Sequence, residues 1–84
     1  MDAAQCAEQS LALSARIKPL LAGKHPAVQA GALADLVSVF LAGHFVAGDA
    51  AATAALRQEL LDEHVRFVKS LVPASEREIA SGRA

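Results

Sequence analysis

Aromatic residues are scarce in this 84-residue sequence, which has no Trp, no Tyr and three Phe. A stacking platform for single-stranded nucleic acid or for a sugar therefore has little to be built from. The chain also has no excess of positive charge, because it contains 8 Lys and Arg and 9 Asp and Glu. Nucleic-acid-binding domains, in contrast, usually carry a basic excess on one face. We expect no nucleic-acid partner.

Cysteine is limited to Cys6, which excludes an internal disulfide and a Cys-based zinc site and is compatible with a reducing compartment. The first ten residues, MDAAQCAEQS, lack the basic region and the continuous apolar region of a secretory signal. These two absences together predict a cytoplasmic protein.

Motifs for catalysis are missing as well. The sequence contains no G-x-S-x-G, no G-x-x-x-x-G-K and no G-x-G-x-x-G, so neither a nucleophile elbow nor a phosphate-binding loop is marked. The local spacing of the His, Asp and Glu residues does not assemble three metal ligands either. We therefore expect a protein without enzymatic activity and without a cofactor.

Alanine is what the sequence has in abundance. Hydrophobic residues make up 54% of the chain, but 20 of them are Ala, which favours helix and contributes little burial. A chain of this length forms one domain, residues 1–84, and its margin of stability is thin unless a partner adds to it.

Helical periodicity and helix-ending residues predict three helices, over residues 3–22, 26–42 and 50–72. Gly23 suits the left-handed conformation that closes a helix. Pro26 suits the first turn of the next helix, because its fixed φ is already helical and its missing N–H would be unpaired there. The very short link between them predicts a helical hairpin.

The other boundaries rest on two prolines and an aspartate. Pro19 either kinks the first helix or ends it near Ile17, with a separate turn after it. Asp49 is a good N-cap for the third helix, and Pro73 is expected to end that helix.

Two short segments lie outside the three helices. The loop over 43–49 holds Phe45 and Val46, which we expect to fold back onto the neighbouring helices because they are poor residues to leave in water. A capping-box spacing begins at Ser75, so the tail is expected to form one or two turns docked by Ile79.

Residues 27–46 are the most unusual segment, because small or aliphatic residues surround the expected helix on almost every side. The segment is about long enough to span a membrane, but Asp35 near its centre would cost roughly 2.5–3.5 kcal/mol to insert, so we expect no membrane span. One apolar stripe can be met by other helices of the same chain: Leu33, Leu36, Val37, Phe40 and Leu41.

A second row on the same helix consists of small residues spaced every four positions, which allows close approach by another helix. With Val39, which adds a third apolar direction, this row gives the expected interface: Ala30, Ala34, Ser38, Val39 and Ala42. The fold predicted is all-α, a three-helix antiparallel bundle completed by dimerisation. Its expected function is that of a small non-catalytic interaction or accessory module that self-associates as a homodimer, with the identity of any other protein partner left open.

Histidine offers the alternative function. His25 and His44 lie at opposite ends of the second helix, roughly 25 Å apart, and cannot share a metal within one subunit. His64 falls in the apolar stripe of the third helix, where a partly buried histidine bonded to a neighbouring helix is the simplest interpretation. The alternative is a polar site of Asp35, His44 and His64, which would make the chain a ligand- or metal-binding helical bundle.

Overall fold

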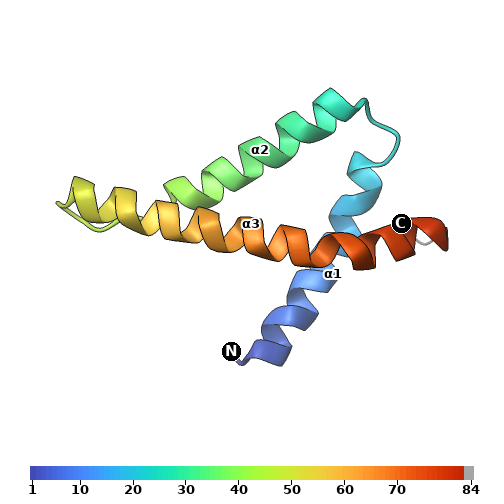
Figure 1. Cartoon of the computed structure of the whole chain (residues 1–84), viewed down its shortest axis with the longest axis horizontal. Helices are drawn as coiled ribbons and strands as arrows, with labels where there is room; N and C mark the ends of the chain where they lie inside the picture. Colours follow the sequence, from blue (N-terminus) through green and yellow to red (C-terminus); the bar gives the residue numbers. More distant parts are fainter. Residues whose placement is uncertain (83–84) are drawn as a thin grey trace. The chain divides into compact units, whose positions relative to one another are not determined.

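A computed structural model describes residues 1–82 and shows three helices and no strand in that range (Figure 1). They are α1 (Ala3–Leu21), α2 (Pro26–Ala42) and α3 (Ala50–Ala80). The all-α prediction is confirmed, and the antiparallel bundle and its completion by dimerisation stay predictions. The chain divides into two compact units, unit 1 over Met1–Gly31 and unit 2 from Ala32 onward, so the boundary falls inside α2.

Helix α1 in unit 1 starts at a capping box that the sequence analysis did not identify. The Gln5 backbone N–H donates to the Asp2 carboxylate at 2.8 Å, and the Asp2 N–H donates to the Gln5 side-chain oxygen at 2.9 Å. The helix then continues through Pro19 to Leu21, so the alternative of a helix that ends near Ile17 is wrong. Pro19 stands close to the C-terminus, where few further hydrogen bonds depend on the turn it disturbs.

The link from α1 to α2 is a tight turn. Gly23 has φ +76° and the Lys24 N–H donates to the Leu21 carbonyl at 3.2 Å, while Ala22 has φ −59° and ψ 134°. This is the geometry of a type II turn, whose third residue requires positive φ, and it confirms the prediction for Gly23. The Gln29 side-chain amide donates back to the Leu21 carbonyl at 2.8 Å and ties the start of α2 to the end of α1.

Helix α3 in unit 2 is longer than predicted. Its N-cap is Asp49, as expected, with the carboxylate accepting from the Ala52 N–H at 2.9 Å. Pro73 lies inside the helix and does not end it, and Ser75 lies inside it as well and does not begin a separate turn. A proline removes one hydrogen bond, and the good helix formers after it, such as Ala74, restore the pattern. The last two residues of the predicted tail, 83–84, lie outside the described residues.

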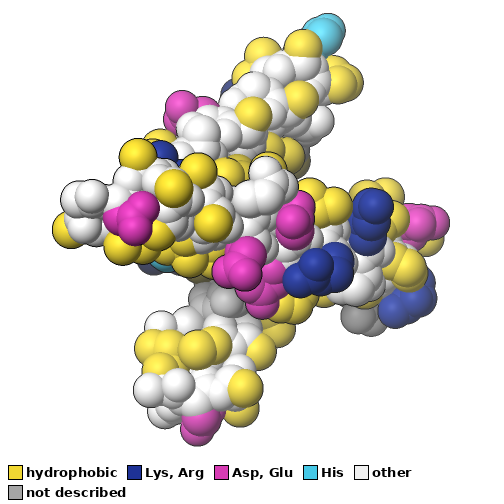
Figure 2. All heavy atoms as spheres, turned by 60° about the vertical axis from the view of Figure 1, so that its left-hand side comes forward, with side chains coloured by type: hydrophobic (Ala, Val, Ile, Leu, Met, Phe, Trp, Pro, Cys, Tyr) yellow, Lys and Arg dark blue, Asp and Glu magenta, His cyan; other side chains and the backbone are white. Residues whose placement is uncertain are grey.

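The side chains are covered only in part. Among residues 1–82 none is buried, and the large apolar side chains that are half-buried in unit 2 belong to α2 and α3. These residues are Val37, Leu41, Leu56, Leu60 and Leu61. On the face of the molecule seen in Figure 2, hydrophobic side chains accordingly reach the surface in many places.

Within the described residues, no helix combines the length and the apolar character that a membrane span requires.

Candidate self-association site

The five residues of the expected interface lie along α2, and all of them are exposed: Ala30, Ala34, Ser38, Val39 and Ala42. Val39, the largest of them, is 63% exposed. The Ser38 hydroxyl donates to the Asp35 carbonyl at 2.8 Å, so its polar group is satisfied within the helix. Close approach of another helix along this row would therefore leave no unpaired hydroxyl.

The neighbouring apolar stripe of α2 lies in unit 2 and is covered only in part within that unit. Val37 and Leu41 are half-buried, but Leu33, Leu36 and Phe40 are exposed, and the exposed fraction of Leu36 reaches 53%. Apolar surface of α2 therefore stays open within unit 2 beside the row of small residues.

Arg57 holds the end of α2 against the start of α3. Its Nε–H donates to the carbonyls of Leu41 at 3.1 Å and His44 at 3.0 Å, and its Nη2 donates to the Ala42 carbonyl at 3.1 Å. Leu41 and Ala42 stand at the C-terminus of α2, where a cation is favoured, and the Leu41 carbonyl also accepts from the His44 N–H at 3.0 Å. The Arg57 side chain is accordingly half-buried in the α2–α3 junction.

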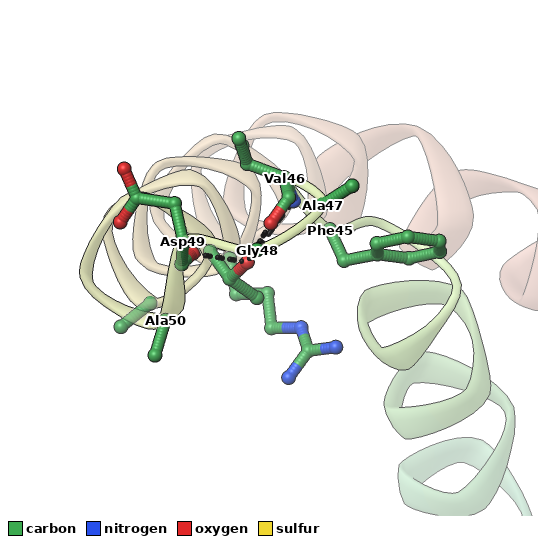
Figure 3. Close-up of a pocket in the computed structure, with 9 residues that line it drawn as sticks. Phe45, Val46, Ala47, Gly48, Asp49 and Ala50 are labelled. Carbon is green, nitrogen blue, oxygen red and sulfur yellow. Dashed lines mark hydrogen bonds between the residues drawn. The ribbon is translucent and has the colours of Figure 1, made fainter.

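Thr53 holds the loop between the two helices. Its hydroxyl oxygen accepts from the Val46 N–H at 3.0 Å and lies 2.8 Å from the Asp49 carbonyl, to which the hydroxyl donates. Gly48 has φ +72° in the turn that this bond network encloses (Figure 3). The loop is thus fixed by hydrogen bonds rather than by apolar packing.

Phe45 and Val46 in this loop do not fold back as expected. Phe45 is 65% exposed and Val46 is also exposed, and Figure 3 shows the two side chains on different sides of the loop. Together with Ala47, Ala50 and Ala54 they line an open hollow. The hydrogen bonds between Thr53 and the backbone of Val46 set the path of the chain at this point.

The three residues of the predicted polar site are not joined by the structure into one site. Asp35 is exposed on α2. The His44 Nδ1 lies 2.7 Å from the Phe40 carbonyl, and its ring centroid is 4.7 Å from that of Phe40. His64 is half-buried in a shallow hollow that it lines together with Phe40, Leu60, Glu63 and Phe67.

Metal binding requires several ligands at one point. In the part of the chain that the structure describes, no three His, Cys, Asp or Glu side chains come close enough to hold a metal ion. His44 is already bonded to its own helix, and the hollow at His64 brings in only one further ionisable side chain, that of Glu63. The ligand- or metal-binding alternative stays a prediction that this geometry does not strengthen.

No family model, no curated protein and no solved structure matches this chain. The function is therefore argued from the surfaces described above.

Two residues that organise the junction could not be identified from sequence. Arg57 bonds to residues 13 to 16 positions away, and Thr53 to a residue 7 positions away. The only available signal was a basic residue in the second turn after an N-cap, at the edge of the apolar stripe, which is also compatible with exposure to solvent.

Proposed function

We propose that this chain is a small non-catalytic α-helical interaction module that self-associates as a homodimer through α2. The observation that carries the proposal is the absence of any buried side chain among residues 1–82 in a chain that is 54% hydrophobic. A soluble domain of this composition gains its stability by removing apolar surface from water. A second copy is the partner that is always present.

A standard protein interface buries about 800 Å² on each partner. The exposed side chains of α2 that would enter the interface include Leu36, Val39 and Phe40 beside the row of small residues. Small residues let the helix axes approach, and the larger ones supply the apolar area.

Asp35 sets a constraint on the geometry. It lies on the same side of α2 as Ser38 and Val39 and is exposed in the single chain. A carboxylate in the centre of an interface would be costly without a partner, so the proposed dimer has to leave Asp35 in contact with water or pair it with a basic side chain of the second copy.

The experiment is sedimentation equilibrium on the wild-type chain and on Val39→Asp. The wild type is expected to be a dimer at micromolar concentration. Val39→Asp introduces a charge at the expected contact and should weaken dimerisation at least 100-fold, because an unpaired buried charge costs several kcal/mol. The residue is exposed in the single chain, so helix content by circular dichroism should change little.

The matched control is Ser70→Asp, which places the same charge at an exposed position of α3 outside its apolar stripe. It should leave the dimer intact. A wild-type chain that sediments as a monomer at micromolar concentration would overturn the proposal. An equal loss of dimer in both variants would show that α2 is not the surface used.

A further inference from the structure

Helix α3 carries a second apolar row that the junction with α2 does not use. Its members alternate at spacings of four and three residues, which is the heptad pattern of a helix that pairs along its length. We name this row the α3 seam: Leu61, Val65, Val68, Val72, Ser75 and Ile79. All six lie in one continuous helix of one unit, and Pro73 falls outside the row.

The seam is open in the single chain. Leu61 is half-buried, and every other member is exposed, up to 68% at Ile79. The part of α2 in unit 2 is about 16 Å long by the helical rise, whereas α3 is about 46 Å long, so this part of α2 is too short to cover α3 from end to end. The row of α3 that does face α2 is a different one and includes Leu56 and Leu60.

We propose that the α3 seam pairs with the α3 seam of a second copy, in antiparallel orientation, with Val65 opposite Val68 of the second copy. This inference rests on the proposed self-association and names a further surface and an orientation for it. Three observations support this pairing: the polar positions within the seam, the charges that flank it, and the open hollow beside the loop over 43–49.

The polar positions of the seam select the register. Continued toward its N-terminal end, the heptad pattern passes through Gln58 and Ala54. With Val65 opposite Val68, Gln58 lies opposite Ser75 of the second copy, and Leu61 lies opposite Val72. Both polar residues then share one layer, and the layers beside it are apolar throughout.

The flanking charges select the same register. In an antiparallel pair, a side chain that flanks the seam lies beside a side chain from the same heptad position of the second copy. Asp62 and Lys69 occupy equivalent edge positions one heptad apart. The proposed register places Asp62 of each copy beside Lys69 of the other and forms two ion pairs. Asp62 already accepts from the Gln58 amide at 2.9 Å and keeps a second oxygen for this contact.

The competing arrangements are less favourable. A shift by one heptad in one direction brings the two copies of Lys69 together, and a shift in the other direction brings the two copies of Asp62 together, which is repulsive. A parallel pair sets Lys69 beside His64 of the other copy and pairs Asp62 only with Arg57. Arg57 is engaged by three carbonyl oxygens of its own chain.

The register also accounts for the hollow at the loop. Ala54 lies opposite Ile79 of the second copy, and Ala54 lines the open hollow together with Phe45 and Val46. The exposed side chain of Ile79 would then enter an apolar hollow that is otherwise open to water. In the proposed dimer, Ile79 of each copy covers the hollow of the other copy, and both are thereby removed from water.

Double electron–electron resonance between nitroxide spin labels on the full chain tests the relative orientation of the two α3 helices. The native thiol is removed by Cys6→Ser, and single labels are placed in two separate variants, Ile79→Cys and Arg66→Cys. The antiparallel pair predicts about 38 Å between the labels at position 79, from the helical rise, and under about 25 Å between those at position 66.

The two measurements separate this inference from the proposed function. A short distance at both positions shows a parallel pair, and a long distance at both shows that α3 does not pair. Either result overturns the seam while self-association stands. A monomer with no dipolar coupling overturns both. If labelling at position 79 prevents dimerisation, the charge variants below still decide the orientation.

A charge swap gives an independent test that does not touch the apolar positions. Asp62→Lys alone and Lys69→Asp alone should each weaken the dimer about tenfold in Kd, and the double variant should recover most of the loss. Arg66→Asp, outside the seam and its edges, is the matched control and should have little effect. A double variant that is no tighter than the single variants would contradict the register.

Discussion

Two regions of unit 2 differ in how their side chains are held. Residues 43–57 form hydrogen bonds within the chain, whereas large apolar side chains lie exposed along residues 65–80 of α3. Three bonds from Arg57 and the hydroxyl of Thr53 fix the first region. The second region continues as regular helix through Pro73 to Ala80. The single chain therefore determines its own junction, and the apolar surface beyond it is available to a second copy.

The largest expected effect falls in the open region, at Pro73. Because α3 continues through this residue, Pro73→Ala restores a backbone donor and removes a ring clash, and should raise the free energy of unfolding by up to about 3 kcal/mol. Urea denaturation followed by circular dichroism measures it. The control is Pro26→Ala, in the first turn of α2, where the missing N–H has no helical partner and the change should be small. Unchanged stability and helix content in Pro73→Ala would mean that the helix ends before this position.

The junction should be broken most readily at Arg57. Arg57→Ala leaves the last carbonyls of α2 without their cation and should lower the free energy of unfolding by about 2 kcal/mol, because hydrogen bonds to charged groups are worth more than neutral ones. Arg57→Lys should recover only part of this loss, since a single ammonium cannot match the fork geometry. Arg66→Ala, an exposed arginine of the same helix, serves as the control. Equal effects in the two alanine variants would remove the capping role.

Thr53 is expected to contribute less. Thr53→Val keeps the shape of the side chain and removes both the acceptor for Val46 and the donor to Asp49, at about 1 kcal/mol in the same denaturation measurement. Ser70→Ala is a suitable control, because its hydroxyl bonds only to the Phe67 carbonyl of its own helix. If Thr53→Val is as stable as wild type, the loop is not held by this hydroxyl.

The smallest effect is expected at Asp35 on α2. Asp35→Asn removes a negative charge at the edge of the expected interface and should tighten the dimer a few-fold, because two copies of the carboxylate repel weakly across the two-fold axis. Sedimentation at low and high salt measures it, and the difference from wild type should shrink as salt increases. A weaker dimer in Asp35→Asn would show that the carboxylate is paired across the interface instead.

The parts of the fold predicted correctly are those determined by local chemistry. The positive φ at Gly23, the fit of Pro26 to the first turn of α2 and the cap at Asp49 each depend on a few neighbouring residues. The prediction that Pro73 ends the helix was wrong. A proline inside a helix costs free energy, but neighbouring helix-forming residues can offset that cost, so whether the helix ends there does not depend on the proline alone.

The candidate site could be predicted only as a pattern. The spacing of Ala34, Ser38 and Ala42 on one side of a helix follows from the 3.6-residue repeat, and their exposure in the structure agrees with it. How much of the rest of α2 stays open could not be predicted, because the cover of Leu36 and Phe40 depends on where other helices lie. The role of Arg57 was missed for the same reason, since its partners are distant in sequence.

The central claim is that the chain completes its apolar packing with a second copy, and the concentration dependence of its stability tests this most directly. Urea denaturation is measured from about 1 to 100 µM chain. For a dimer whose folding is coupled to association, each tenfold increase in concentration adds about 1.4 kcal/mol per dimer, so the midpoint should rise steadily over this range. A midpoint that is the same at every concentration would contradict the account.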